Sequence, residues 1–449
     1  MICRHHLRLA VSLYGAAVVF TSGTWLRADD AADTQRQLQQ LREQNEKLQE
    51  QLHQQQLLIE SLSKSVKEIQ ATNTARSQEI EHLETEIKDV SLEKKPATGF
   101  SLGKVNLSAE GGVGFFESGS QGAYPNSEFR VDEAKLFIEA PVWDQTYFYT
   151  EINLTTRETS NFQVELGECY LDFENVSRLW HRDRMLNVRA GRMDIPFGEE
   201  YLTRDAIDNP LISHSLTDFW GVDQGVELYG SLGQFTYVTA VQNGGSGGTS
   251  DYDSDKAVSG RIGYDPANWL HLSVSGMRTG DLNTQKDYWS QLWFANGWLM
   301  PFGTPNATRI NANLVEGDVE FRLPKGHVHA FGGYAHQEDN DPGVNNRRDI
   351  YFYSVEAVHD VVGKLYAGAR FSQIFAPKGY PIAANGSQSE YLYSGVLTDE
   401  IWRLTLGLGY RFSQNLVLKT EYTFERGNTT TGENRDHEDL FALEAAFKF

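Results

Sequence analysis

Apolar positions divide this chain into three stretches with different periods. A mainly apolar stretch from Leu9 to Phe20 comes first, and a seven-residue repeat follows between residues 38 and 90. From Gly103 to Phe449, apolar and polar residues alternate with a period of two. These periods predict, in order, a short apolar segment, a coiled helix and a series of β-strands.

The first 28 residues are typical of a cleavable signal peptide. Basic residues precede the apolar run, and small or polar residues follow it. Twelve apolar residues are too few to cross a bilayer as a helix, so residues 1–28 are predicted to direct export and then to be removed. An uncleaved signal anchor is the alternative. Cys3 would leave with the signal peptide, and Cys169 alone cannot form a disulfide within the chain.

The repeat in residues 34–92 predicts an α-helical parallel coiled coil. Apolar residues occupy twelve of sixteen positions that are spaced alternately by three and four residues. A repeat of this kind lines the seam of a left-handed supercoil. Asn45 and Asn73 fall at the same position of the repeat, where buried amides that meet their symmetry mates fix register and strand number. A solvated single helix is the alternative.

Sixteen alternating segments follow a linker over residues 93–102. The expected strands lie near 103–117, 127–141, 143–156, 163–176, 183–195, 222–232, 233–243, 255–265, 268–280, 308–322, 326–336, 349–361, 363–374, 400–413, 415–427 and 438–449. Tight turns alternate with longer loops between them, which places the tight turns at one rim and the loops at the other. Only the connection near 175–183 is longer than the other turns at its rim. This sorting and an even strand count are typical of outer-membrane barrels, where closure satisfies every backbone amide in lipid. Residues 103–449 are therefore predicted to form an all-β transmembrane barrel of about 16 antiparallel strands.

The C-terminus adds a prediction of cellular location. The last segment ends in Phe449, which resembles the signal read by the barrel-assembly machinery of Gram-negative bacteria. With the signal peptide, it predicts the bacterial outer membrane, with the lipid bilayer and the assembly machinery as partners. The coil would then lie in the periplasm, within reach of the cell wall. The net charge of −21 argues against nucleic acid as a partner, because nucleic acids are polyanions.

Residues 190–201 carry a family resemblance. Their sequence, Ala-Gly-Arg-Met-Asp-Ile-Pro-Phe-Gly-Glu-Glu-Tyr, resembles the fifth-strand region of the phosphate-selective porin O and P family. Asn209-Pro-Leu-Ile and Gly225-Val-Glu-Leu-Tyr-Gly are similar in placement, so the resemblance covers roughly residues 100–449 and the coil is an addition. It implies trimers of sixteen-stranded barrels whose third loop folds inward. A homotrimer would share its axis with a three-stranded coil, although the repeat itself does not separate dimer from trimer.

These features predict a porin, a water-filled channel for passive diffusion of small hydrophilic solutes or ions. The alternative is a structural role, in which the barrel anchors the coil as a spacer toward the cell wall. An enzyme is not expected, because the sequence lacks metal-spaced His/Cys clusters, a nucleophile elbow and a phosphate loop. No cofactor is expected either.

Charged residues on the pore wall and on the constricting loop would set selectivity. Candidates on the third loop, about residues 197–221, are Glu199, Glu200, Arg204, Asp205 and Asp208. Candidates on the polar faces of the strands are Arg189, Arg261, Arg322, Arg370, Arg403 and Arg411. These arginines either form a track for anions or pair with wall carboxylates. Because acidic residues are in excess, we expect weak cation preference or none, which makes phosphate selectivity doubtful.

Two further patterns allow two interpretations each. The aromatic segment from Trp289 to Trp298 suits either sugar stacking at a pore mouth or packing of a loop against the rim or a neighbouring barrel. His327 and His329, with neighbouring acids, suit either a metal or plain polar lining of a lumen. Polar lining is the more common role of alternating strand histidines, so no metal site is predicted.

Overall fold

The structure, a computed structural model, describes residues 104–157, 164–245, 250–287, 289–300, 302 and 306–449. The predicted signal peptide, the coiled coil with Asn45 and Asn73, and the linker lie outside the described residues. The chain divides into two units, residues 1–100 and residues 101–449, and every described residue belongs to the second. In the described ranges, no helix is both long and apolar enough to cross a membrane.

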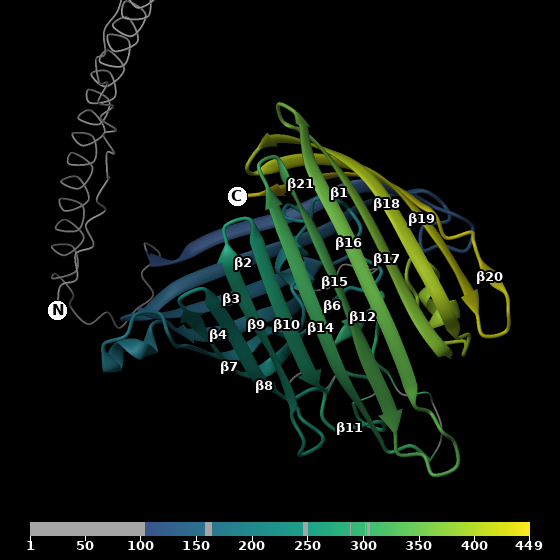
Figure 1. The fold of residues 1–449 in the computed structure, drawn as a ribbon, viewed down its shortest axis with the longest axis horizontal. Helices are drawn as coiled ribbons and strands as arrows, with labels where there is room; N and C mark the ends of the chain where they lie inside the picture. The colour runs from purple at the N-terminus through teal and green to yellow at the C-terminus, as the bar shows by residue number, and fades with distance from the viewer. Residues whose placement is uncertain (1–103, 158–163, 246–249, 288, 301, 303–305) are drawn as a thin grey trace, which may run out of the picture. The chain divides into compact units, whose positions relative to one another are not determined.

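A single antiparallel sheet closes on itself as a barrel (Figure 1). Its sixteen long strands are β1 (Asn106–Ser118), β2 (Glu128–Trp143), β3 (Thr146–Thr155), β4 (Glu165–Phe173), β5 (Asn187–Asp194), β7 (Val222–Leu232), β8 (Phe235–Gln242), β9 (Ala257–Ala267), β10 (Leu270–Arg278), β14 (Arg309–Leu323), β15 (Gly326–Asp339), β16 (Arg348–Val362), β17 (Leu365–Tyr380), β18 (Thr398–Ser413), β19 (Leu416–Thr429) and β21 (Leu440–Lys448). Two short strands, β11 (Leu282–Asn283) and β20 (Asn434–Arg435), extend the same sheet. Three more, β6 (Phe219–Trp220), β12 (Trp293–Phe294) and β13 (Gly297–Trp298), form a small separate sheet. The predicted barrel of sixteen antiparallel strands is confirmed.

The barrel closes where the first strand meets the last. β1 pairs with β2 on one side and with β21 on the other. The Phe449 N–H donates to the Ala109 carbonyl at 2.9 Å, and the Ala109 N–H donates to the Phe449 carbonyl at 3.0 Å. The chain terminus therefore completes the hydrogen-bonded seam, while the Phe449 side chain remains 73% exposed.

Alternation along the strands separates an apolar outer face from the lumen. In β18, Leu406 and Leu408 are 45% and 49% exposed, whereas Arg403 and Thr405 are buried. Successive strand side chains point to opposite faces, so the arginine and threonine point into the barrel. The outer face is the kind of surface that acyl chains cover in a membrane barrel.

Each predicted strand has a counterpart, and β17 extends furthest beyond its expected end. It continues to Tyr380, beyond the expected end at residue 374, and its pairing with β18 shifts between Phe375 and Tyr380. Pro377 has no N–H to donate and Gly379 has a φ of 77°, so the pattern there resembles a loop. The strand resumes after this irregularity because Tyr380 is fully buried in the barrel interior.

Tight turns join the strands at one rim. Gly233 and Gly363 adopt positive φ angles of 68° and 59° in the β7–β8 and β16–β17 turns. The turn predicted to be long, between β4 and β5, contains a 3₁₀ helix, η2 (Val176–Trp180). The Asn175 side chain organises it by accepting the Arg184 N–H at 2.8 Å. We call this rim the turn side and the opposite rim the loop side.

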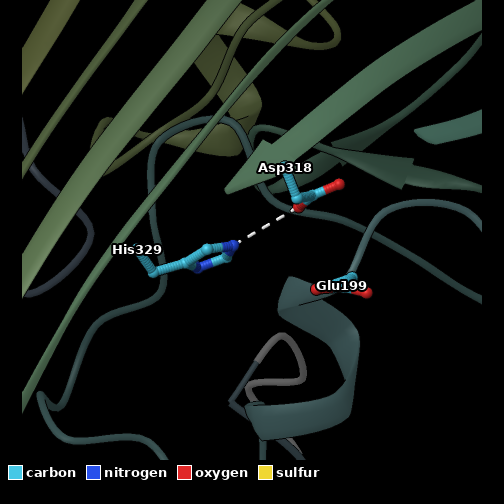
Figure 2. Close-up of side chains that lie close together, drawn as sticks. All are labelled: Glu199, Asp318 and His329. Atoms are coloured by element: carbon cyan, nitrogen blue, oxygen red, sulfur yellow. Dashed lines mark ion pairs between the residues drawn. The ribbon is translucent and has the colours of Figure 1, made fainter. Parts of the chain in front are cut away.

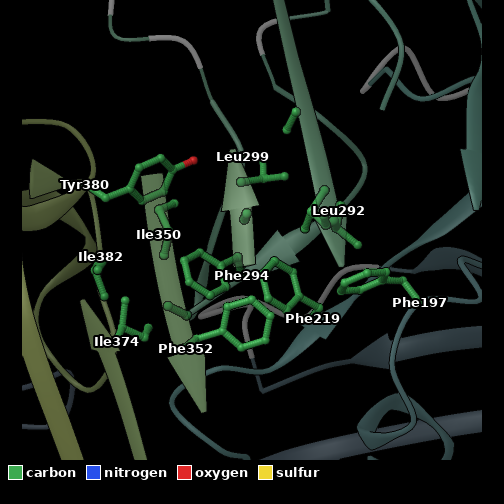
Figure 3. Packing of buried hydrophobic residues seen from close by; sticks show 14 of the residues in the cluster. Phe197, Phe219, Leu292, Phe294, Leu299, Ile350, Phe352, Ile374, Tyr380 and Ile382 are labelled. Carbon is green, nitrogen blue, oxygen red and sulfur yellow. The ribbon is translucent and has the colours of Figure 1, made fainter. Parts of the chain in front are cut away.

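The largest buried apolar cluster lies inside the barrel (Figure 3). Loop residues contribute Phe197, Leu216, Phe219, Leu292, Phe294 and Leu299, and the strands contribute Leu314, Phe331, Ile350, Phe352, Ile374 and Ile401, among others. We call this set the loop-side cluster. The expectation that the inner face lines water throughout is therefore wrong on the loop side, where apolar loop side chains occupy the interior.

Candidate functional site

The segment between β5 and β7, residues 195–221, folds into the barrel. Ile195, Phe197, Leu211, Ile212 and Leu216 are each 1% exposed. Within the segment, a 3₁₀ helix, η3 (Glu200–Thr203), precedes the two-residue strand β6. We call this segment the constriction loop after the role that the sequence analysis predicts for it; the structure shows that its apolar side chains are buried.

Side chains of the wall hold the backbone of the constriction loop. The Glu421 carboxylate of β19 accepts the N–H groups of Ile212 and Ser213 at 2.6 and 3.0 Å. Lys419 lies two residues before Glu421 on the same face of β19, toward the turn side. Its ammonium donates to the carbonyls of Ala206 and Leu211 at 2.6 and 2.9 Å. Each contact satisfies a backbone group that would otherwise be buried without a partner. The loop is consequently fixed against the β17–β19 wall.

The predicted loop residues occupy different surroundings. Glu200 accepts the Ser215 N–H at 2.7 Å, and Glu199 meets His271 Nε2 at 2.9 Å. Arg204 forms an ion pair with Asp218, and its guanidinium carbon lies 4.1 Å from the ring centroid of Trp220. Asp208 is half exposed and lies 3.4 Å from Lys448 Nζ. The five predicted residues therefore do not converge on one point.

Asp205 belongs to a separate group of carboxylates around Lys135 of β2. Lys135 Nζ lies 2.6 Å from both Asp205 and Glu133, and 3.8 Å from Glu110. Burial raises the pKa of Asp205, but the charge and hydrogen bond of Lys135, a hydrogen bond with Glu110 and the charge of Arg204 together lower the pKa below its usual value. The loop carboxylate is thus ionised and tied to the wall.

All six predicted wall arginines make ion pairs. Arg189 pairs with Asp172 and Glu227, Arg261 with Glu199, Arg322 with Asp265 and Glu320, Arg370 with Glu356, Arg403 with Glu425, and Arg411 with Asp360. The side chains of Arg370 and Arg403 are 7% and 6% exposed, whereas that of Arg411, near the turn-side rim, is 49% exposed. The buried arginines also donate to the constriction loop, at the carbonyls of Ser213 and His214.

Sequence reasoning missed the lysines of the lumen. Lys419 is 1% exposed and pairs with Glu444 at 2.9 Å, and Lys135 holds the carboxylates around Asp205. A signal was present, because Lys419 lies two residues from Glu421 and therefore on the same face of β19. The parity of polar strand positions, applied to lysines as well as arginines, identifies both.

A cavity of about 460 Å³ lies on the inner face of β4, β5, β7, β8 and β9. Its lining includes Glu168, Tyr170, Arg189, Glu227 and Arg261. The Arg189 guanidinium carbon lies 4.3 Å from the ring centroid of Tyr170, so the cation is held against an aromatic face. Charged and aromatic groups here face space that the constriction loop does not fill.

The aromatic segment from Trp289 to Trp298 turns inward. The rings of Trp293 and Trp220 stack with centroids 5.4 Å apart, and β12 pairs with β6 of the constriction loop. Phe294 belongs to the loop-side cluster and stacks on Phe219 at 4.4 Å. The described side chains of this segment therefore pack a loop against another loop inside the barrel, rather than against the outer rim.

Solved outer-membrane proteins share this fold. OmpT, an outer membrane protein of Vibrio cholerae, matches with a TM-score of 0.51 and 11% identity over 77% of this chain and 97% of that one. The outer membrane channel DcaP of Acinetobacter baumannii gives a TM-score of 0.50 and 14% identity, over 79% of this chain and 100% of that one. An anion-selective porin from Comamonas acidovorans gives 0.50 and 10%, over 77% and 98%.

At these identities the likeness shows the barrel fold. No protein-family model matches the sequence, and no curated protein matches it. The resemblance to the phosphate-selective porin O and P family therefore stays a prediction.

Proposed function

We propose that this protein is a porin of the bacterial outer membrane, which lets small hydrophilic solutes or ions diffuse passively. The observation that carries the proposal is the closed barrel with an apolar outer face, a charged turn-side lumen and a constriction loop inside. A barrel of sixteen strands is wide enough to hold a passage beside an inward loop. The solved channels with the same fold support the proposal.

We place the passage on the β4–β9 side, through the cavity beside Arg189. On the opposite side, the constriction loop packs against β17–β19 and occupies the lumen. Selectivity is proposed to be weakly cationic or absent. Each of the six wall arginines is paired with at least one carboxylate, so none offers an anion an uncompensated positive charge. Phosphate selectivity is accordingly not part of the proposal.

The proposed assembly follows the sequence patterns. The mature chain would form a homotrimer on a parallel three-stranded coil in the periplasm, after loss of the signal peptide and insertion by the barrel-assembly machinery through its Phe449 terminus. The threefold axes of coil and barrels would coincide. Chemical crosslinking of the purified protein, with and without residues 30–95, would measure the contribution of the coil.

Planar-bilayer recording tests the channel. Purified protein is expected to produce stepwise conductance, and a salt gradient is expected to give a reversal potential near zero or slightly toward the cation potential. A variant lacking residues 30–95 should keep its unit conductance, whereas a spacer would lose its role. Folded protein that inserts but gives no steps would contradict the proposal, and a strongly anionic reversal potential would contradict the selectivity.

A further inference from the structure

Three potential metal ligands from three segments meet on the turn side of the lumen (Figure 2). Glu199 comes from the constriction loop, Asp318 from β14 and His329 from β15. One ligand atom from each residue lies within 4.8 Å of the others. His329 Nε2 is 3.4 Å from Asp318 Oδ1, and neither atom has a hydrogen-bond partner among the described residues. Figure 2 marks this contact as an ion pair, which requires a protonated imidazole; when the imidazole is neutral, both atoms carry lone pairs that could bind a metal.

A further buried carboxylate stands beside them. Glu316 is 3% exposed and interacts electrostatically with Asp318 and Glu199. It lies against Gly198, where an added Cβ would come within 2.3 Å of a Glu316 carboxylate oxygen. Within the described ranges, Glu316 has neither a hydrogen bond nor an ion pair. Its carboxylate therefore adds to the cluster without a polar partner of its own.

The fixed positive charge near this cluster is small. Arg261 Nε lies 3.5 Å from Glu199, and the same carboxylate meets His271. Three carboxylates thus share one guanidinium and two imidazoles. Buried carboxylates are costly unless a cation balances them, so the arrangement favours an additional cation.

A second cluster shows what a compensated site looks like in the same barrel. Glu110, Glu133 and Asp205 also bring three ligand atoms within 4.8 Å. There, Lys135 Nζ reaches all three carboxylates, at 2.6 to 3.8 Å. Its ammonium places a fixed positive charge among these three carboxylates, which the cluster around Asp318 lacks. The Lys135 cluster provides a matched control.

We propose that Glu199, Asp318 and His329 bind a divalent transition-metal cation. One imidazole nitrogen with two carboxylate oxygens is a ligand set suited to Zn²⁺ and its neighbours, whereas Ca²⁺ and Mg²⁺ favour oxygen ligands alone. The cation would tie the constriction loop to two wall strands and bring positive charge to the turn-side lumen. This inference goes beyond the proposed channel and does not require conduction.

Calorimetric titration of the chelator-treated, full-length protein in detergent with Zn²⁺ tests the site. The chain contains 12 histidines, so the difference between variants decides rather than total uptake. Asp318→Asn and His329→Gln are each expected to weaken one Zn²⁺ site per chain at least tenfold. Glu110→Gln, which alters the lysine-compensated cluster, is expected to leave that affinity unchanged.

The proposal is overturned if Asp318→Asn and His329→Gln titrate like the wild type, or if Glu110→Gln weakens binding equally. Far-UV circular dichroism checks that each barrel is folded. Should a wall variant fail to fold, Glu199→Gln on the constriction loop removes a ligand without altering a strand, and it must weaken binding by the same factor. Because the titration needs no ion flow, a silent bilayer would count against the channel and not against this site.

Discussion

The lumen face of β14, β16 and β17 carries two surfaces of opposite chemistry. Toward the loop side it is apolar, with Ile310, Ala312 and Leu314 on β14, Ile350 and Phe352 on β16, and Ile374 and Ala376 on β17. Toward the turn side the same face carries Glu316, Asp318, Ser354, Glu356, Arg370 and Ser372. Both halves are buried, so burial does not distinguish them; what distinguishes them is the kind of contact that each makes with the loops.

The apolar half holds loop segments by close packing. Packing of this kind has no preferred contact direction and excludes water. The charged half, in which we include the neighbouring buried charged residues Arg403 of β18 and Glu421 of β19, holds the constriction loop through directional contacts. Glu421 and Arg370, for example, bind its backbone. On the β4–β9 side of the barrel, Arg189 and Glu227 line the cavity that the constriction loop does not fill. Loop segments are therefore held by packing at one end of β14, β16 and β17, while the other end presents charged groups to the lumen.

The largest effect is expected from breaking a buried ion pair in the charged half. Arg403→Met leaves Glu425, which is 0% exposed, without its cation, and also removes the donor to the His214 carbonyl. An uncompensated buried charge costs about 3–5 kcal/mol, so the free energy of unfolding should fall by that amount. Urea titration in detergent micelles, followed by tryptophan fluorescence, measures it.

Arg411→Met is the matched control for this prediction. It lies on the same strand, and its pair with Asp360 is about half exposed. Solvent-exposed pairs contribute at most about 1 kcal/mol, so this variant should unfold close to the wild type. Equal losses in the two variants would show that the distinction between buried and rim pairs is wrong.

A smaller loss is expected from the apolar half. Phe294 is 2% exposed and contacts Phe219, Phe352 and Tyr380. Phe294→Ala removes these contacts and should cost about 3 kcal/mol, at the low end for a buried phenylalanine because loops can partly collapse into the space. Unit conductance should rise as the loops loosen, while the reversal potential stays constant because no charge changes. An unchanged urea midpoint together with unchanged conductance would show that this cluster does not hold the loops.

Much of the barrel could be predicted because successive strand residues face opposite sides of the sheet, so an apolar outer face and a polar inner face produce alternation with a period of two. It located sixteen strands and placed Arg403 inside and Leu408 outside. The content of the loop-side lumen could not be predicted in this way. The start of β16 reads Ile350, Tyr351, Phe352 and Tyr353, so both faces are apolar or aromatic, and periodicity cannot tell which one packs against a loop.

The candidate site was only partly predictable for a related reason. Strand parity places Arg189, Arg370 and Arg403 on the inner face, but their carboxylate partners come from neighbouring strands whose register depends on turn geometry. The link between Glu199 and Asp318 spans more than a hundred residues of sequence. Only the folded constriction loop brings such residues together, which a local pattern does not record.

The smallest expected effect is a pH dependence confined to the constriction loop. Burial lowers the pKa of His214 well below its usual value of 6.5, and the positive charges of Arg204 and Arg157 lower it further. In the unfolded chain, His214 binds a proton near pH 6.5, whereas in the folded barrel it stays neutral at that pH. The free energy of unfolding therefore falls as the pH drops below that value. Between pH 7 and pH 5.5, His214→Asn should lose about 1 kcal/mol less than the wild type in urea titrations. Phe294→Ala, on the apolar half, should keep the wild-type pH dependence; if His214→Asn keeps it as well, the imidazole is not held neutral by the charged half of the lumen.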